Sequence, residues 1–353
     1  HNRVRRQRQM CIRDRYFNTV AEYIWLGGKD EFRSKTRVFD GEVRLLEQLP
    51  KWNYDGSSTE QAKGTDSEVI LVPRQVFPDP IRGGNSILVW CETMRPDGSY
   101  LHNSHRHWAN DIFEQNKDAE PWFGLEQEYF MIDSDTKKPL GYGEKKKQGQ
   151  FYCSVGTDNA FGRGLADEHL QACISAGIKI SGINAEVAPG QWEFQIGPCV
   201  GIEEGDHLWI ARYLLVRLSE KYNVTIDFEP KPLEGDWNGS GCHANYSTKE
   251  MREGSDGKPG LYFIDNAIEK LSHRHMVHMK MYGSGNEKRM TGEHETASYD
   301  KFSDGVANRG ASIRRGNDTV KNGKGYFEDR RPSSNCDPYL VTAMLFKTTI
   351  LDD

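Results

Sequence analysis

The stretch Trp122–Tyr129 (Trp-Phe-Gly-Leu-Glu-Gln-Glu-Tyr) holds two acidic residues two positions apart, Glu126 and Glu128. Its apolar and aromatic residues predict a β-strand, in which residues i and i+2 point to the same face. Two carboxylates placed side by side repel one another, and a divalent cation bound there would offset the repulsion. The alternative is a solvated edge strand with two incidental glutamates. The other polar segments of the chain distinguish these two interpretations.

Length and composition predict a folded protein with a large core and two domains. The chain has 353 residues, 36% of them hydrophobic, and a net charge of −6. We expect neither a membrane protein nor a nucleic-acid binder, because no apolar run could span a bilayer and no basic face dominates. The 7 cysteines form no C-x-x-C pair, which argues against a disulfide scaffold or a zinc finger. A reducing compartment fits best, so we expect a cytoplasmic protein, with an organellar form as the alternative.

The start of the chain differs from the rest. Residues 1–15 contain 6 arginines and 1 aspartate, with no apolar periodicity and no secretory hydrophobic segment. A transit peptide is disfavoured, because the usual serine richness is missing. We interpret this segment as disordered or artefactual sequence and leave it out of the fold.

Residues 16–100 predict a small β-rich domain. Short β-prone runs separated by glycine-rich and proline-rich turns lie at 21–26, 34–39, 67–72 and 87–91. Between them, Trp52–Thr59 is too polar and glycine-rich for a core strand, so we expect a long functional loop around Asp55. From the local residues alone, a plain Asp-Gly turn at Asp55 is the favoured interpretation.

Residues 101–353 predict a second domain in which helices and strands alternate. Apolar residues at helical spacing predict helices over 104–116, 165–176, 203–222, 261–281 and 338–350. Five histidines of this domain invite a metal interpretation: His105, His107, His273, His275 and His278. No acid completes a site around them, so we interpret them as helix-surface residues.

Two further segments alternate polar and apolar residues as strands do. Ile183–Glu186 leads through a Pro-Gly turn into Gln191–Ile196, which predicts a hairpin that brings Glu186 near Glu193. In Cys242–Ser247, alternation places three polar side chains on one face: His243, Asn245 and Ser247.

The last polar segments add arginines to these acids. They are the loop Arg289–Glu295, the segment Asn308–Arg314, and the strand-like run Gly325–Pro332, which holds Glu328 and Arg330 on one face. Oxygen ligands with few nitrogens suit Mg²⁺ or Mn²⁺, and arginines suit phosphate and carboxylate substrates. No P-loop and no kinase motif is present. The residues alone therefore predict a metal-dependent phosphoryl-transfer enzyme of a different architecture, acting on an anionic substrate.

Seven motifs, in this order, resemble glutamine synthetase of the eukaryotic type over roughly residues 20–350. They are WNYDGSST, WFGLEQEY, NAEVAPGQWEFQIGP, GDWNGSGCHANYST, TGEHET, VANRGASIR and GYFEDRRPSSNCDP. The resemblance implies an α+β fold, with an N-terminal β-grasp domain over 16–100 and a C-terminal catalytic domain over 101–353. That catalytic domain would have a curved antiparallel sheet flanked by helices. The resemblance also implies a homo-oligomer, a decamer of two pentameric rings, with each active site between two subunits.

The resemblance assigns roles to individual residues. Two or more Mg²⁺ or Mn²⁺ ions would be held by two groups, Glu128, Glu186 and Glu193 in the first and Glu126, His243 and Glu328 in the second. ATP would be bound by Trp122, Glu193, His243, Asn245, Ser247, Arg314 and Tyr326. Glutamate would be bound by Asp236, Trp237, Asn238, Gly239, Arg289, Arg309 and Arg330. The catalytic residues would be Asp55, Glu295, Arg309 and Arg330, with Glu295 on a mobile flap.

The activity that the resemblance implies is ATP-dependent ligation of ammonia to L-glutamate through γ-glutamyl phosphate. The alternatives are a ligase of the same fold for another amine, a non-catalytic structural relative, and a guanidino kinase of related fold. The chain departs from the family pattern at Glu293, where an aromatic residue is expected, and at Arg315–Gly316, where Ile-Pro is usual. None of these departures removes a ligand.

Overall fold

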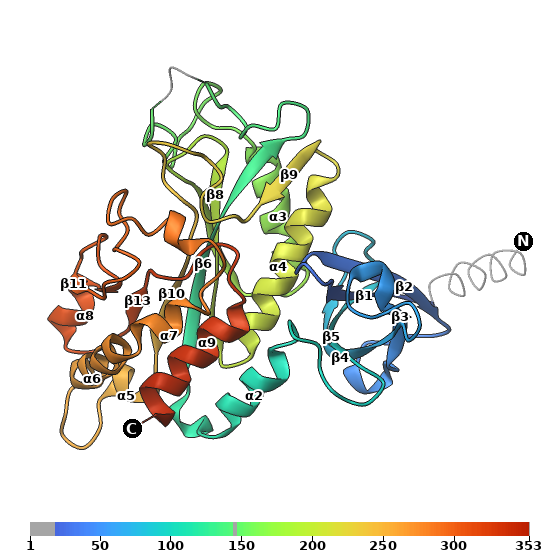
Figure 1. The fold of residues 1–353 in the computed structure, drawn as a ribbon, viewed down its shortest axis with the longest axis horizontal. Coiled ribbons are helices and arrows are strands. Elements are labelled where there is room, and N and C mark those ends of the chain that lie inside the picture. The colour runs from blue at the N-terminus through green and yellow to red at the C-terminus, as the bar shows by residue number, and fades with distance from the viewer. Residues whose placement is uncertain (1–17, 144–146, 353) are drawn as a thin grey trace, which may run out of the picture. The chain divides into compact units, whose positions relative to one another are not determined.

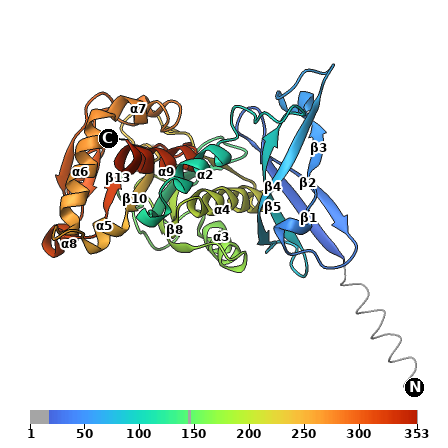
Figure 2. The ribbon, with the colours of Figure 1, turned by 90° about the horizontal axis from the view of Figure 1, so that it is seen from below.

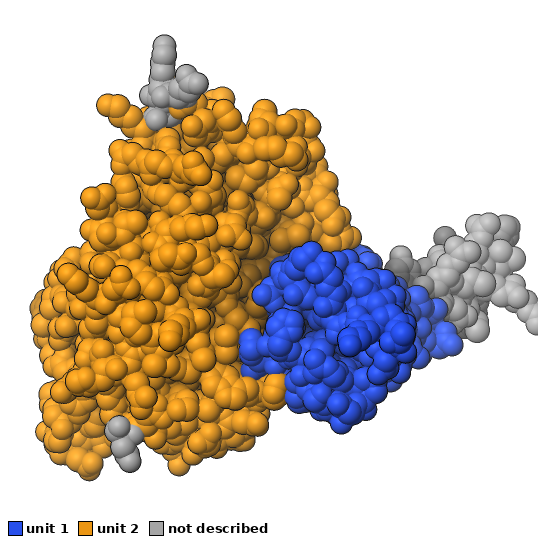
Figure 3. Space-filling view, in the orientation of Figure 1, with its two compact units in different colours: residues 1–105, 172–178 blue, residues 106–171, 179–353 orange. Residues whose placement is uncertain are grey.

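The computed structural model describes residues 18–143 and 147–352 (Figure 1). Residues 1–15, which we interpret as disordered or artefactual, lie outside the described residues. Figure 3 shows two compact units, unit 1 with the chain up to residue 105 and 172–178, and unit 2 with the rest. The domain boundary at residue 100 stays a prediction. Within the described ranges, no helix is long and apolar enough to cross a membrane.

Unit 1 contains a sheet of five strands in the order β2-β1-β5-β4-β3. β1 and β5 run parallel and the other neighbours antiparallel. Buried side chains such as Tyr23, Trp25 and Leu71 form its core. Each predicted β-prone run overlaps a strand. The strands are β1 (Thr19–Leu26), β2 (Phe32–Phe39), β3 (Trp52–Asp55), β4 (Glu68–Pro78) and β5 (Ile87–Met94).

The prediction of a long loop over Trp52–Thr59 was wrong. Trp52–Asp55 is strand β3, paired with β4, and Gly56–Thr59 is a short 3₁₀-helix. Trp52 and Tyr54 alternate along β3 and pack against the core of unit 1, so two aromatic side chains outweigh the polar residues between them. Asp55 ends the strand and caps the 3₁₀-helix, since its Oδ1 accepts the Ser57 N–H at 3.0 Å.

Unit 2 is built on an eight-stranded, curled sheet with the long strand β6 (Trp122–Asp133) near its middle. The strand order is β11-β12-β13-β10-β6-β8-β7, with β9 also paired to β6. All pairs are antiparallel except β11 with β12. The remaining strands are β7 (Ile180–Ala185), β8 (Gln191–Val200), β9 (Val224–Asp227), β10 (Cys242–Ser247), β11 (Asp304–Val306), β12 (Ile313–Arg315) and β13 (Phe327–Asp329).

Helices α2 (Arg106–Glu114), α4 (Glu203–Ser219) and α9 (Pro338–Phe346) pack together along one face of this sheet (Figures 1 and 2). α4 is buried on almost every side, which explains why its apolar residues are not confined to one stripe. The other face of the sheet is left to loops and polar side chains. The remaining α-helices are α3 (Arg163–Ser175), α5 (Lys249–Glu253), α6 (Gly260–His273), α7 (His275–Met279) and α8 (Asn317–Asn322).

The helix predicted over 261–281 is in fact two helices, α6 and α7, separated at Arg274. The break turns His275 inward, where its Nε2 lies 2.8 Å from the Tyr299 carbonyl oxygen. His278 is also buried, between the hydroxyl groups of Tyr282 at 2.7 Å and Thr348 at 2.9 Å. The prediction that His275 and His278 lie on a helix surface was therefore wrong. His273 is exposed, as predicted.

A buried ion pair stabilises the segment that carries Glu328 and Arg330. Asp329 and Arg331 are both 0% exposed, and the Arg331 Nη2 donates to Asp329 Oδ2 at 2.7 Å. We expect Arg331→Met to lower the free energy of unfolding by about 3–5 kcal/mol, because Asp329 would stay buried without its partner. Urea denaturation measures the change. Lys29→Met, which removes the exposed pair with Glu60, is the control and should leave stability unchanged.

Candidate active site

A polar pocket of about 270 Å³ lies in unit 2 on the face of the sheet opposite α4 and α9. Strands β6, β8, β10 and β13 and several loops contribute to its lining. The pocket brings together thirteen of the predicted site residues: Glu126, Glu128, Glu186, Glu193, Asn238, Gly239, His243, Arg289, Glu295, Arg309, Arg314, Glu328 and Arg330.

Strand register explains why these side chains meet. Glu128 pairs with Glu193 across β6 and β8, and Glu126 pairs with His243 across β6 and β10. Residues directly opposite one another in a ladder share a face of the sheet. Glu186 follows β7 at the hairpin turn, where its backbone N–H donates to the Gln191 carbonyl at 2.9 Å. The predicted hairpin is thus present, and it places Glu186 beside Glu193.

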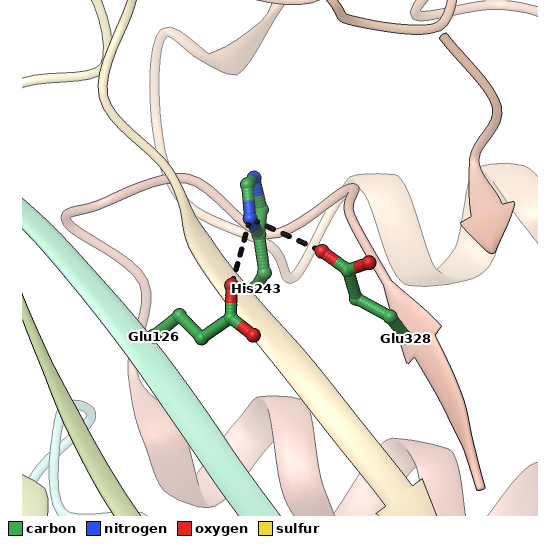
Figure 4. Close-up of side chains that lie close together, drawn as sticks. All are labelled: Glu126, His243 and Glu328. Atoms are coloured by element: carbon green, nitrogen blue, oxygen red, sulfur yellow. Dashed lines mark ion pairs between the residues drawn. The ribbon is translucent and has the colours of Figure 1, made fainter. Parts of the chain in front are cut away.

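The acids and the histidine form two separate groups. Within each group, the potential ligand atoms all lie within 4.8 Å of one another. The first group is Glu128, Glu186 and Glu193, and the second is Glu126, His243 and Glu328. Figure 4 shows the second group converging from β6, β10 and β13, with His243 Nδ1 at 3.4 Å from a carboxylate oxygen of both glutamates. Each group offers three donors of the kind that Mg²⁺ or Mn²⁺ binds, carboxylate oxygens and, in the second group, one imidazole nitrogen.

Burial and neighbouring charges shift the pKa of several of these candidate ligands. Burial lowers the pKa of His243 well below its usual value, and the nearby positive charge of Arg330 lowers it further. The imidazole is therefore neutral and can donate a lone pair. Burial also raises the pKa of Glu128, Glu186 and Glu193, and neighbouring carboxylates raise it further. Without a cation, the first group therefore retains protons that a cation would displace.

The metal-free protein is expected to lose stability as the pH rises. Carboxyl groups whose pKa is raised in the folded state bind protons more tightly there than in the unfolded chain. Their contribution is therefore largest below the unfolded pKa, near 4.5, and is lost as the pH rises through the higher folded values. In EDTA, the melting temperature should fall between about pH 6 and pH 9, and Mg²⁺ should restore most of it. Glu193→Gln should flatten this dependence; an unchanged slope in that variant would contradict the expectation.

Four arginines surround the acidic groups. Arg314 donates to Glu328 Oε2 at 2.9 Å, and Arg330 donates to Glu328 Oε1 at 2.6 Å. Arg289 is buried and fixed by the carbonyl oxygens of Arg331 at 2.8 Å and Pro332 at 3.1 Å. Arg309 lies 3.4 Å from Glu295. The pocket can therefore hold several negative charges of a substrate close to bound cations.

A second pocket, of about 480 Å³, shares Glu126 and Gln195 with the first. It brings together four residues predicted to bind ATP: Trp122, Asn245, Ser247 and Tyr326. The sequence reasoning missed Arg252, whose guanidinium lies 3.9 Å from the ring centre of Trp122 and donates to Ser247 Oγ at 3.0 Å. The available signal was a basic residue four positions after the end of the motif GDWNGSGCHANYST.

Three predicted residues line neither pocket. Asp236 lies 3.3 Å from His294, and the ring of Trp237 lies 6.4 Å from that of Tyr142, tilted by 50°. Asp55 belongs to unit 1, where hydrogen bonds from Ser57 and Ser58 lower its pKa to about 2, so it is ionised. Conversely, the pocket includes lining residues that the sequence reasoning missed: Tyr152, Asn184, Gln195, His294 and Thr296.

The loop that carries Glu295 is strained at its tip. His294 and Glu295 have φ of 52° and 61°, values that non-glycine residues rarely adopt. The loop is fixed at its base by a bridge between Thr291 and Ser298, and Arg330 donates to the Glu295 carbonyl at 3.3 Å. Glu293, one of the departures noted above, is exposed and lies outside the pocket lining.

Comparison with known proteins agrees with this geometry. Residues 105–351 match the family model "Glutamine synthetase, catalytic domain". The chain is 56% identical to the chloroplastic glutamine synthetase of Zea mays over 338 residues, covering 94% of this chain and 79% of that protein. It is 55% identical to a cytosolic isozyme of Pinus sylvestris over 338 residues, covering 94% of both chains.

A solved structure shares the fold. The cryo-EM structure of Plasmodium falciparum glutamine synthetase superposes with a TM-score of 0.72 at 17% identity, covering 95% of this chain and 72% of that one. The α+β fold predicted from the motifs, with a curled sheet flanked by helices, is confirmed. With a family model matched over most of its length and relatives at this identity, the chain belongs to the glutamine synthetase family.

Proposed function

We propose that the two pockets together ligate ammonia to the γ-carboxylate of L-glutamate, using ATP and forming L-glutamine, ADP and phosphate. Family membership supports this activity. The observation that carries it is the pair of three-ligand groups, flanked by arginines and joined to a nucleotide-sized pocket through Glu126. A carboxylate is a poor electrophile, so it must be activated before an amine can attack it.

Mg²⁺ or Mn²⁺ fits both ligand groups, since their donors are carboxylate oxygens and one neutral imidazole. Glu128, Glu186 and Glu193 would hold one ion, and Glu126, His243 and Glu328 would hold a second. When bound, these cations supply charge neutralisation for the phosphate oxygens of ATP.

The protein side chains have distinct tasks in the first half-reaction. Arg289 binds the α-carboxylate of glutamate, and Asn238 and Gly239 complete that end of the pocket. A γ-carboxylate oxygen of glutamate attacks the γ-phosphorus of ATP, and the bond from that phosphorus to the bridging oxygen breaks to release ADP. Arg314 and Arg330 each donate to one carboxylate oxygen of Glu328, beside the place of the transferring phosphoryl group. Their positive charges offset the negative charge on that group.

In the second half-reaction, ammonium must lose a proton before it can attack. Glu295, beside Arg309 at the mouth of the pocket, is placed to bind the cation and to take that proton. The resulting ammonia attacks the carbonyl carbon of γ-glutamyl phosphate, and inorganic phosphate leaves towards Arg309 and Arg330. Asp55, ionised at neutral pH, is the second carboxylate assigned to ammonium, supplied by a neighbouring subunit of a ring.

Assembly and location belong to the same proposal. The decamer of two pentameric rings rests on the family resemblance, and it would give Asp55 a site to complete. Relatives from Pinus sylvestris and Arabidopsis thaliana are named cytosolic isozymes, and that from Zea mays is named chloroplastic. We place this chain in the cytoplasm, with an organellar form as the alternative.

The test is phosphate release from ATP in the presence of Mg²⁺ and glutamate, with and without ammonium. Release that requires both substrates, with glutamine formed in equal amount, supports the proposal. Release that needs glutamate but responds to ethylamine rather than ammonium would indicate another amine acceptor. No release under any condition, from protein that still assembles, would indicate a non-catalytic relative.

A further inference from the structure

A buried carboxyl group behind the second pocket has no part in the mechanism above. Glu204 lies in the first turn of α4 and is 0% exposed. Its Oε1 accepts a hydrogen bond from the backbone N–H of Leu125 at 3.1 Å. Burial raises the pKa of Glu204 well above its ordinary value. Its observed role is that of a hydrogen-bond acceptor for the β6 backbone.

Glu204 lies where β6 and β8 depart from regular pairing. Leu125 pairs with Ile196, but Phe123 pairs with Cys199, so β8 contains one residue more than β6 across this step. The extra residue falls at Gly197–Pro198. Such a bulge disrupts the ladder locally, and at this point the Glu204 carboxyl accepts the Leu125 N–H.

The opposite side of this bulge forms a wall of the second pocket. Gly197 and Pro198 line that pocket together with Glu126. Gly197 has φ of 117°, and a Cβ there would lie 2.6 Å from the Phe123 carbonyl oxygen and 3.2 Å from Glu204 Oε2. The glutamate side chain thus packs directly behind the glycine turn, with no room between them.

We propose that Glu204 is a positioning residue for the nucleotide half of the site. By holding Leu125 and the Gly197–Pro198 turn, it fixes one wall of the second pocket and the direction of Glu126, the next residue along β6. This inference rests on the proposed function, because it takes the second pocket to bind ATP. Arg289 and Gly239 line the first pocket alone, so glutamate binding should not depend on Glu204.

The test compares variants of the full-length protein by calorimetric titration with ADP and Mg²⁺ and by steady-state kinetics. Glu204→Leu should weaken ADP binding and raise the KM for ATP about tenfold, and it should change the KM for glutamate by less than about twofold. Glu204→Gln keeps a side-chain carbonyl that can accept the Leu125 N–H and should bind ADP as the wild type does. Glu203→Gln is the matched control, since this glutamate shares the same helical turn and pairs with Lys179 at 2.7 Å.

The outcomes separate the inference from the proposed function. Unchanged ADP affinity in Glu204→Leu, or an equal rise in both KM values, would overturn the positioning role. If Glu204→Leu does not fold, Glu204→Met carries the same comparison, because its flexible side chain fills the space without supplying an acceptor. A wild-type protein that fails to bind ADP would instead contradict the proposed function.

Discussion

Replacing Glu128 by alanine is expected to lower the rate of glutamine formation by about 10³-fold or more. Glu128 lies at the centre of the first ligand group, opposite Glu193 on the neighbouring strand, and its Oε2 accepts the Gly241 N–H at 2.6 Å. Its loss leaves two carboxylates to hold a cation that needs several ligands. Glutamine and phosphate should be measured together at saturating ATP, glutamate, ammonium and Mg²⁺.

A matched control comes from the strand β9, which pairs with β6. Asp227, on β9, is a partly buried carboxylate opposite Phe130 of β6 and lies outside both pockets. Asp227→Ala should keep most of the activity. Glu128→Gln, which preserves size, should lose activity as Glu128→Ala does while keeping the melting temperature. Near-normal turnover in either Glu128 variant would sink the assignment of this residue as a metal ligand.

Replacing Arg330 by alanine is expected to lower kcat by about 10²–10³-fold, with little change in the affinity for ADP. Arg330 is mostly buried, with a side chain 10% exposed, and it is directed at Glu328 and held by the Arg309 carbonyl at 3.0 Å. It lines the first pocket only, so it can act on the transferring phosphoryl group without contributing to the second pocket. Single-turnover phosphate release measures the chemical step, and equilibrium titration measures ADP binding.

The chain provides a control for the loss of a positive charge. Arg315 forms ion pairs with Asp265 and Asp304 outside both pockets, although it adjoins Arg314 in sequence. Arg315→Ala should retain kcat. Arg330→Lys should recover only part of the rate, since an ammonium group cannot reproduce the planar fork of a guanidinium. A loss of ADP binding equal to the loss of kcat in Arg330→Ala would show that the residue acts on binding instead.

Local patterns account for the predictions that succeeded. The alternation in Gln191–Ile196 and in Cys242–Ser247 predicted which side chains share a face, and the register of β6, β8 and β10 agrees. The pairing of Glu186 with Glu193 followed from a short turn, because a hairpin places nearby residues of one chain together. These features depend on neighbours within about a dozen residues, which the sequence displays directly.

The predictions that failed concern residues whose environment comes from distant segments. Trp52 and Tyr54 form a strand because they pack on the core of unit 1. Helix α6 ends at His273, and His275 beyond it bonds to the Tyr299 carbonyl oxygen. In the sequence, Glu204 stands near the start of the helix predicted over 203–222, a place typical of exposed acids. In the structure it is buried under a bulge between β6 and β8.

Periodicity and motif order in the sequence were enough for the family, for the strands β6, β8 and β10 of the site, and for the two groups of candidate metal ligands. They were not enough to predict which residues are buried. Burial is set by which segments meet in three dimensions, and no local pattern encodes those contacts. The raised pKa values of Glu128, Glu186 and Glu193, the neutral His243, the second pocket beside Arg252 and the carboxyl of Glu204 behind its wall all arise from that packing.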